Sequence, residues 1–216
     1  MNSRYVLLDL DGTLTDPEIG ITNSIMYALN KFGIVVEDRA TLHKFIGPPL
    51  VDSFMGYYYF SREDAKKAIE YYRENYAETG IFENEIYEGI PELLEELNSN
   101  NITCVLATSK PTFFATQVIK HFGLQKFFAY LSGTTLDDTL ITKDAVIEQA
   151  IKHLAITDFE NTIMVGDRKH DIECAHVNGI KCIGVLYGFG SKDELVGAGA
   201  DYISETVPDL RKLLMR

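Results

Sequence analysis

The sequence has few of the features that mark disulfide-stabilised, nucleic-acid-binding or membrane proteins. It contains three cysteines without metal-site spacing, which predicts reduced, buried thiols in a cytoplasmic protein. It has 20 Lys and Arg against 32 Asp and Glu, a formal net charge of −12, which argues against binding to nucleic-acid polymers. No apolar run has the length of a membrane span, and Met1–Arg4 leads directly into a strand-like run without a signal-peptide pattern.

The sequence does have the length of a globular protein, and its predicted strands and helices alternate. A length of 216 residues suits one large domain, or a core domain with a smaller insert. Strand-like runs alternate with helical runs, which predicts an α/β fold with a doubly wound parallel sheet. The expected strands are Tyr5–Leu8, Ile102–Ala107, Ala129–Ser132, Thr162–Val165, Cys182–Val185 and Tyr202–Ile203. The expected helices are Pro91–Asn98, Thr112–Phe122, Lys143–His153, Asp171–Val177 and Pro208–Leu214.

The segment 17–82 breaks this alternation. It contains no convincing strand, and Ile21, Ile25 and Leu29 recur at helical spacing. Ser61 precedes two acidic residues and reads as the N-cap of another helix. We therefore expect an α/β core made of residues 1–16 and 83–216, and an all-helical inserted domain made of residues 17–82.

Two carboxylates, Asp9 and Asp11, stand where the first strand ends. Ligands of open α/β sheets bind at this carboxyl edge, and residues two apart on an extended segment point the same way. Two like charges so close call for a cation, a shared proton or a strong hydrogen-bond network, and Mg²⁺ fits such oxygen ligands. The alternative is an ordinary strand end followed by an Asp-Gly turn.

Three later segments carry comparable signals. Thr108 and Ser109 follow a strand and could bind an anion or cap the next helix. Lys143 begins a predicted helix, where the helix dipole disfavours a cation, although most such lysines are solvated. Asp167 and Asp171, in Gly-Asp-x-x-x-Asp, would face one site if the chain turns into a helix, or else form a surface turn.

Together these segments resemble the ordered signatures of the haloacid dehalogenase superfamily of phosphohydrolases. The resemblance covers nearly the whole chain and implies a Rossmann-like core with a helical cap of the first cap class. It implies that Asp9 is the nucleophile that forms an aspartyl-phosphate, and that Asp11 is the general acid and base. The second signature, Thr-Ser-Lys-Pro, matches the Thr-Asn-Lys-Pro of phosphoglycolate-phosphatase-like members. The third signature, which contains Lys143, lacks the prolines that often follow this lysine in the family.

The resemblance also implies roles for the remaining site residues. Phosphate would be bound by Gly12, Thr108, Ser109 and Lys143. Mg²⁺ would be held by Asp9, the backbone carbonyl of Asp11, and Asp167, with Asp171 in the outer shell. Because an acidic protein repels phosphate at long range, local cations must reverse the field at the site. Arg168, Lys169 and His170 could contribute, although a solvated loop is the alternative.

The inserted segment carries the candidate contacts to the leaving group. Gly47 and Pro48, with nearby His43 and Lys44, resemble a substrate-covering loop or else form a proline-stiffened helix connection. The aromatic residues could form the core of the insert or stack on a base; they are Phe54, Tyr57, Tyr58, Tyr59 and Phe60. The glycine-rich stretch Gly184–Gly190 predicts a flexible loop near the site or a simple turn.

The resulting prediction is a Mg²⁺-dependent phosphatase, a monomer or homodimer, acting on a small phosphomonoester metabolite. Its substrate would be phosphoglycolate-like or a nucleoside monophosphate. One alternative is a phosphotransferase similar to β-phosphoglucomutase; the other is a non-catalytic binding protein that kept the fold.

Overall fold

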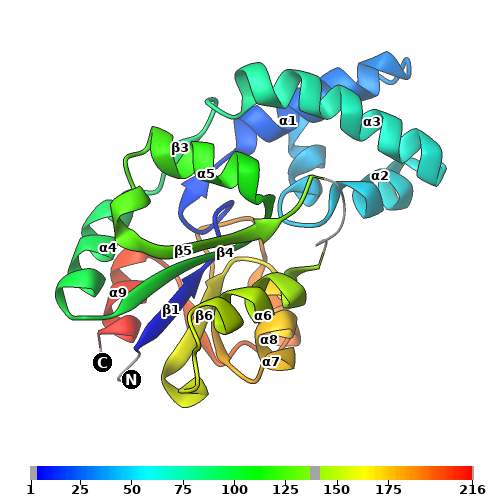
Figure 1. Ribbon diagram of the computed structural model, residues 1–216. Helices are drawn as coiled ribbons and strands as arrows, with labels where there is room; N and C mark the ends of the chain where they lie inside the picture. The colour runs from blue at the N-terminus through cyan, green and yellow to red at the C-terminus, as the bar shows by residue number, and fades with distance from the viewer. Residues whose placement is uncertain (1–3, 137–141, 216) are drawn as a thin grey trace. The chain divides into compact units, whose positions relative to one another are not determined.

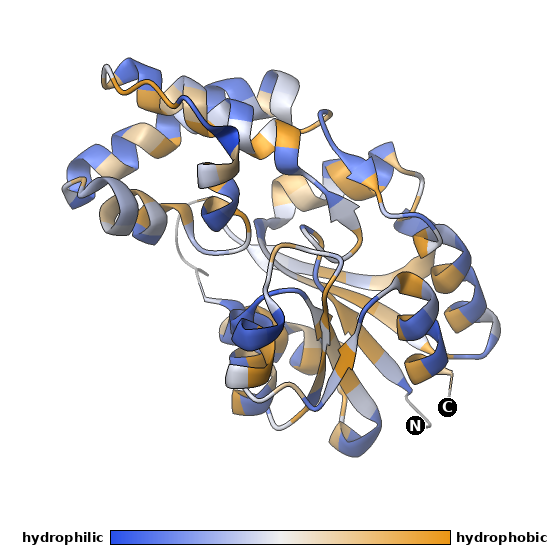
Figure 2. Cartoon of the chain, turned by 180° about the vertical axis from the view of Figure 1, so that it is seen from behind, coloured by the Kyte–Doolittle hydropathy of each residue, from blue (hydrophilic) through white to orange (hydrophobic). Residues whose placement is uncertain are grey.

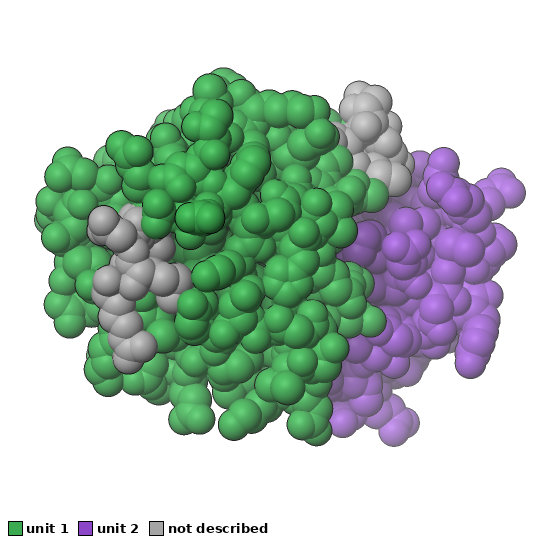
Figure 3. Space-filling view, turned by 90° about the horizontal axis from the view of Figure 1, so that it is seen from below, with its two compact units in different colours: residues 1–16, 86–216 green, residues 17–85 purple. Residues whose placement is uncertain are grey.

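The computed structural model describes residues 4–136 and 142–215, which form two compact units. Unit 1 comprises residues up to Asp16 and those from Ile86 onward, and unit 2 comprises Pro17–Glu85 (Figure 3). The sequence places the second boundary after residue 82, three residues earlier. Two short strands, β2 (Thr15–Asp16) and β3 (Glu85–Ile86), pair where the chain passes from one unit to the other.

Unit 1 is built on a six-stranded parallel sheet with the order β5-β4-β1-β6-β7-β8 (Figure 1). Its strands are β1 (Tyr5–Leu8), β4 (Thr103–Pro111), β5 (Phe128–Thr134), β6 (Thr162–Gly166), β7 (Lys181–Val185) and β8 (Tyr202–Ser204). The chain runs from β1 to β4 and β5 on one side, then returns to β6 on the other. This reversal makes the carboxyl end of β1 a topological switch point, where open α/β sheets bind ligands.

Helices cover both faces of this sheet, which confirms the predicted α/β class. One face carries α6 (Lys143–His153), α7 (Lys169–Val177) and α8 (Lys192–Gly197). The other carries α4 (Ile90–Ser99), α5 (Thr112–His121) and α9 (Val207–Leu214), and short helical turns occupy Gln125–Phe127 and Phe159–Asn161. Because helices cover both faces, the inner strands bury apolar residues on both sides, and residues 6–8 of β1 and 163–165 of β6 are at most 1% exposed. Figure 2 shows orange, hydrophobic stretches in the sheet.

The register of the sheet aligns its buried residues. Leu7 of β1 lies opposite Val105 of β4 and Met164 of β6, and all three side chains are fully buried. On one face these residues pack against Val146 of α6 and Ile172 of α7. This continuous apolar core fixes the ends of β1, β4 and β6 side by side.

Unit 2 is helical, with α1 (Glu18–Lys31), α2 (Leu50–Tyr58), α3 (Arg62–Asn75) and two irregular turns, η1 (Arg39–Phe45) and η2 (Tyr76–Gly80). The Ser61 hydroxyl accepts a hydrogen bond from the Asp64 N–H, which confirms the predicted N-cap of α3. Among the described residues, no helix combines the length and apolar character needed to cross a membrane.

Two expectations about the elements were wrong. The strand expected to end at Ala107 continues to Pro111, because residues up to Pro111 still pair with β5 through an irregular register. The short helix α8 was not expected, because its six residues are too few to show helical periodicity.

Candidate active site

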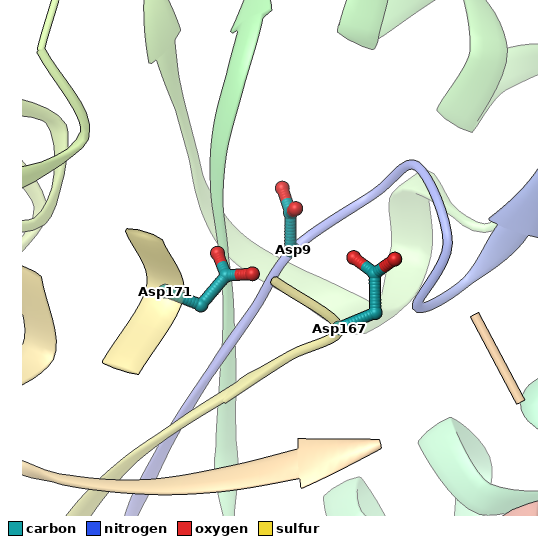
Figure 4. A group of neighbouring side chains, drawn as sticks. All are labelled: Asp9, Asp167 and Asp171. Carbon is teal, nitrogen blue, oxygen red and sulfur yellow. The ribbon is translucent and has the colours of Figure 1, made fainter. Parts of the chain in front are cut away.

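Three aspartates gather at the carboxyl edge of β1 and β6. Asp9 directly follows β1, Asp167 directly follows β6, and Asp171 lies in the first turn of α7 (Figure 4). One carboxylate oxygen from each lies within 4.8 Å of the others, and all three residues are buried. Three buried carboxylates at this spacing repel one another unless positive charge lies among them.

Lys143 supplies part of that charge. Its Nζ lies 2.7 Å from Asp9 Oδ1 and 2.7 Å from Asp171 Oδ1, and the residue is 6% exposed. The interpretation of Lys143 as a solvated surface lysine is therefore wrong. The start of α6 presents this ammonium to two acids that belong to other elements of the chain.

Asp11 has a different cation. Lys110, from the carboxyl end of β4, places Nζ 2.7 Å from Asp11 Oδ2 and 2.8 Å from Asp11 Oδ1. The backbone N–H of Lys110 donates to Thr108 Oγ1, and Thr134 Oγ1 donates to the Ser109 carbonyl. Thr108 and Ser109 therefore belong to β4 and directly precede Lys110, the residue that pairs with Asp11. Their interpretation as a helix cap is wrong.

Glycines let the chain close tightly around Asp167. Gly12 adopts a positive φ of 78°, and a Cβ built there would lie 2.2 Å from Asp167 Oδ2. A Cβ at Gly188 would lie 2.5 Å from Asp167 Cβ, and the next residue, Phe189, donates its backbone N–H to Asp167 Oδ2 at 2.8 Å. The surface-turn interpretation of Asp167 is therefore wrong, since the residue is enclosed by the first signature and the loop after β7.

Burial dominates the electrostatics of the acids. It raises the pKa of Asp11 despite the opposing charge of Lys110. Burial, followed by the charges of Asp171 and Asp9, raises the pKa of Asp167 well above its usual value. Burial also raises the pKa of Asp171 to about 6 although Lys143 opposes it. For Lys143, burial alone would lower the pKa, but the pairs with Asp171 and Asp9 outweigh it and raise the value.

This arrangement fits a divalent cation with oxygen ligands. Among the described residues, the four carboxylates of Asp9, Asp11, Asp167 and Asp171 contact two ammonium groups, those of Lys110 and Lys143. Asp167 Oδ1 is buried and has no hydrogen-bond partner among the described residues, although Oδ2 has one. A donor set made only of carboxylate and carbonyl oxygen suits Mg²⁺, Mn²⁺ or Ca²⁺ rather than softer metals.

Comparison with known proteins agrees with this geometry. The family model for haloacid dehalogenase-like hydrolases matches residues 6–185, which is most of the chain. The chain belongs to the haloacid dehalogenase-like hydrolase family. It is an enzyme of this family, and its relatives' names agree with the predicted hydrolysis of a phosphoric monoester.

Three relatives describe this membership further. The chain is 44% identical to a 5'-nucleotidase of Pseudomonas aeruginosa, over 98% of this chain and 96% of that protein. It is 33% identical to the tyrosine-protein kinase PtkA of Mycobacterium tuberculosis, over 98% of this chain and 72% of that protein. A crystal structure described as a predicted phosphatase from Clostridium acetobutylicum has a TM-score of 0.97, with 48% identity over 100% of this chain and 99% of that chain.

Two parts of this haloacid dehalogenase site were not assigned a role from the sequence. Lys110 was noted only as part of the second signature, because a lysine after a strand gives no sign of which acid it will meet. The stretch Gly184–Gly190 was expected to form a flexible loop near the site or a simple turn, with no partner named; Phe189 N–H donates to Asp167, and Tyr187 OH donates to the Thr13 carbonyl at 3.1 Å. Its glycines were the available signal, since close backbone approach requires residues without Cβ.

The three basic residues between Asp167 and Asp171 lie in different environments. Arg168 is not a solvated loop residue, because its Nε donates to Glu194 Oε1 at 2.9 Å and its side chain is 12% exposed. The Lys169 backbone N–H donates to the same oxygen. His170 lies in α7 beside Glu173, at 3.8 Å. Glu194, which neutralises Arg168, comes from the unexpected helix α8.

The candidate leaving-group residues all lie in unit 2. His43 Nε2 lies 2.9 Å from Glu18 Oε1, and Lys44 Nζ lies 4.2 Å from the centre of the Tyr57 ring. Gly47 and Pro48 connect η1 to α2, and Gly47 has a φ of 101°. Phe54 is fully buried against Phe45, at 5.2 Å between ring centres, as expected for a core residue of the insert. The role of these residues toward substrate stays a prediction.

Proposed function

We propose that this protein is a Mg²⁺-dependent phosphatase that hydrolyses a small phosphomonoester metabolite through an aspartyl-phosphate formed on Asp9. The observation that carries the proposal is the environment of Asp9. Its carboxylate is buried at a topological switch point, 2.7 Å from the Lys143 ammonium and beside Asp167 and Asp171. A carboxylate is a usable nucleophile at neutral pH because it needs no deprotonation.

In the first half-reaction, an Asp9 oxygen forms a bond to phosphorus while the bond between phosphorus and the leaving oxygen breaks. Asp11, as the acid, gives its proton to that oxygen, so the leaving group departs as a neutral alcohol. Lys143 screens the negative charge of Asp9 from the incoming phosphate and remains close to the transferred group. Thr108, Ser109 and Gly12 would hold the phosphoryl oxygens through a hydroxyl and backbone N–H groups.

In the second half-reaction, Asp11 accepts a proton from water as the water oxygen bonds to phosphorus. The bond between Asp9 and phosphorus then breaks, and inorganic phosphate leaves with Asp9 restored as a carboxylate. Two steps with one acid–base residue replace a single slow displacement by water.

The metal would be held by Asp9, the Asp11 carbonyl and Asp167, with Asp171 supporting from the outer shell. When bound, Mg²⁺ supplies positive charge that offsets the repulsion between a carboxylate nucleophile and an anionic phosphate. The glycine-lined enclosure and the Phe189 N–H hold the Asp167 carboxylate where it would serve as a ligand.

The proposed substrate is a small molecule, phosphoglycolate-like or a nucleoside monophosphate. A nucleoside monophosphate is supported by the 5'-nucleotidase name of the Pseudomonas aeruginosa relative. The phosphoryl-binding residues belong to unit 1, whereas the candidate leaving-group residues, His43, Lys44, Gly47 and Pro48, belong to unit 2.

A phosphotransferase remains the second candidate. The kinase name of the Mycobacterium tuberculosis relative favours it, since an aspartyl-phosphate can pass its phosphoryl group to a hydroxyl instead of water. The β-phosphoglucomutase-like version of this alternative requires transfer between positions of a sugar phosphate.

A screen of phosphorylated metabolites with Mg²⁺ tests both candidates. Release of inorganic phosphate from nucleoside monophosphates or phosphoglycolate, ranked by kcat/KM, supports the phosphatase. Transfer of labelled phosphate to a sugar or tyrosine hydroxyl, without release, supports the phosphotransferase. Inactivity of purified, folded protein toward the whole panel would leave only the non-catalytic alternative.

A further inference from the structure

Lys110 forms a buried, two-point contact that the proposed chemistry does not yet use. Its Nζ lies 2.7 Å from one oxygen of Asp11 and 2.8 Å from the other. The side chains are 5% and 11% exposed, so water screens the pair only weakly. A cation held between both oxygens restricts rotation of the carboxylate plane as well as its position.

Stability is a poor explanation for such a pair. Desolvating two charges costs as much as, or more than, their attraction returns, so buried ion pairs are weak contributors to folding. Apolar residues of similar size would fill this position at the sheet edge at least as well. A function that needs an oriented carboxylate explains why a lysine stands there.

The strand that carries Lys110 is hydrogen-bonded to its neighbours on both sides. β4 pairs directly with β1, the strand that precedes Asp9 and Asp11. The Lys110 N–H donates to Thr108 Oγ1, and the neighbouring Ser109 carbonyl accepts from Thr134 Oγ1. The lysine stem therefore starts from a strand of the same sheet as β1, the strand that leads into the aspartates.

The two buried lysines also contact different acids of the site. Lys143 contacts Asp9 and Asp171, whereas Lys110 contacts Asp11. If Asp9 is the nucleophile, Lys143 serves the transferred phosphoryl group. Lys110 then serves the residue that exchanges protons with the leaving oxygen and with water.

We propose that Lys110 is a positioning residue that orients the Asp11 carboxyl group for proton transfer to the leaving oxygen. The inference rests on the proposed phosphatase function and adds a distinct consequence. An alkyl leaving group needs a well-placed acid because its alkoxide is strongly basic. A 4-nitrophenolate leaves with little protonation, so misplacement of Asp11 matters much less for that substrate.

The experiment compares wild type with Lys110→Met on 4-nitrophenyl phosphate, phenyl phosphate and adenosine 5'-monophosphate, using kcat/KM with saturating Mg²⁺. We expect a loss of about 100-fold for the nucleotide, about 10-fold or less for 4-nitrophenyl phosphate, and an intermediate loss for phenyl phosphate. Lys152→Met is the matched control, because Lys152 pairs with Glu148 at 2.6 Å on the exposed surface of α6. It should leave all three values unchanged.

A double-mutant cycle separates positioning from packing. Adding Lys110→Met to Asp11→Asn should lower kcat/KM no further, because the group that Lys110 orients no longer transfers protons. Equal losses on all three substrates, or a further loss in the Asp11→Asn background, would overturn the proposal. A Lys110→Met protein with wild-type kinetics would overturn it as well.

Lys110→Met leaves the Asp11 charge buried without this partner and could unfold the protein, so a second variant is needed. Lys110→Arg keeps the charge and moves it, and should show the same leaving-group trend with a smaller loss; a uniform loss again overturns the inference. If wild type itself releases no phosphate from any substrate, the proposed function fails, which differs from an active wild type whose Lys110 variants show no trend.

Discussion

The two units of this protein bury different kinds of side chain. Among the described residues, every buried charged side chain belongs to unit 1, namely Asp9, Asp11, Lys110, Lys143, Asp167 and Asp171. Unit 2 buries none and instead packs aromatic rings, with Phe54 5.8 Å from Phe60 and 5.2 Å from Phe45. Burying charge costs free energy that burying aromatic rings does not, so its concentration at one sheet edge identifies where the chemistry lies.

The difference also separates two kinds of specificity. In the proposed function, the buried, paired charges of unit 1 act on the phosphoryl group. The polar candidates of unit 2, His43 and Lys44, lie at partly or fully exposed positions on a short turn. Substitutions there can change recognition without removing a buried charge, so the two units should respond differently to mutation.

The largest expected effect belongs to Asp9. Asp9→Asn should abolish turnover, a loss of about 10⁴-fold or more in kcat, because an amide cannot form the aspartyl-phosphate. Asp209→Asn, a change at an exposed ion pair of α9, is the control and should retain wild-type turnover. Circular dichroism must show that the Asp9 variant is folded. Substantial phosphate release by that folded variant would remove Asp9 from its proposed role.

Removal of the metal should lower the catalytic activity about as much as Asp9→Asn does. Chelation with EDTA should abolish activity, and Mg²⁺ should restore it, because the four buried carboxylates contact two ammonium groups among the described residues. Ca²⁺ should inhibit, since its larger and looser coordination misplaces the nucleophile. Mg²⁺ should also raise the melting temperature of wild type, and raise it less in Asp167→Asn. Full activity after exhaustive chelation contradicts this prediction.

The difference between the two units is tested most directly by comparing the kinetic effects of Lys143→Ala, in unit 1, with those of substitutions in Gly47–Leu50, in unit 2. In the proposed mechanism Lys143 acts on the transferred group, which all substrates share, so Lys143→Ala should lower kcat for every substrate by about 10²–10³-fold. Changes in Gly47–Leu50 should alter the ranking of substrates, with differences of about 10–100-fold between esters. The measurement is kcat and KM over one panel of chemically distinct phosphate esters.

The opposite pattern would reverse this division of labour. If Lys143→Ala reordered the panel while the loop variants scaled it uniformly, unit 1 would recognise the leaving group and unit 2 the phosphate. Thermal unfolding should accompany the Lys143 measurements, because removing the ammonium leaves Asp9 and Asp171 without it and costs about 3–5 kcal/mol.

The sequence predicted much of unit 1 because its site lies on strand ends. Val6, Leu7 and Leu8 read as a doubly buried strand, so the position of Asp9 at its carboxyl edge followed from topology alone. The same reasoning placed Asp167, since Gly166 ends an apolar strand. Side-chain partners between distant segments could not be predicted in this way. Lys110 and Asp11 are 99 residues apart, and their pairing depends on register and rotamer rather than on local pattern.

Unit 2 was predicted only as a helical segment, for a related physical reason. Helical periodicity indicates which side of a helix is buried, as for Ile25 and Leu29, but it does not indicate what the other side recognises. Glu194 shows the same limit within unit 1. It belongs to a six-residue helix without visible periodicity, yet it holds Arg168 beside the acidic site.

The smallest expected effect is on stability and concerns the ion pair between Glu194 and Arg168, next to the acidic site. Glu194→Gln should lower the free energy of unfolding by about 1 kcal/mol at pH 7, since it weakens a charge-assisted contact with Arg168. Burial alone would raise the pKa of Glu194, but hydrogen bonds from Arg168 and the Lys169 N–H outweigh it and hold the pKa below its usual value.

A lowered pKa fixes the sign of the pH dependence. The stabilisation by Glu194 should be fully present above the pKa of an unfolded glutamate, about 4.3, and should disappear as the pH falls through the lower folded value. Urea unfolding of wild type and Glu194→Gln between pH 3 and 7 measures this. The two stabilities should differ at pH 7 and converge toward the acidic end, whereas Lys152→Met, at an exposed pair, should stay within about 0.5 kcal/mol of wild type throughout. A constant difference across the whole range would mean that Glu194 acts through packing rather than through its charge.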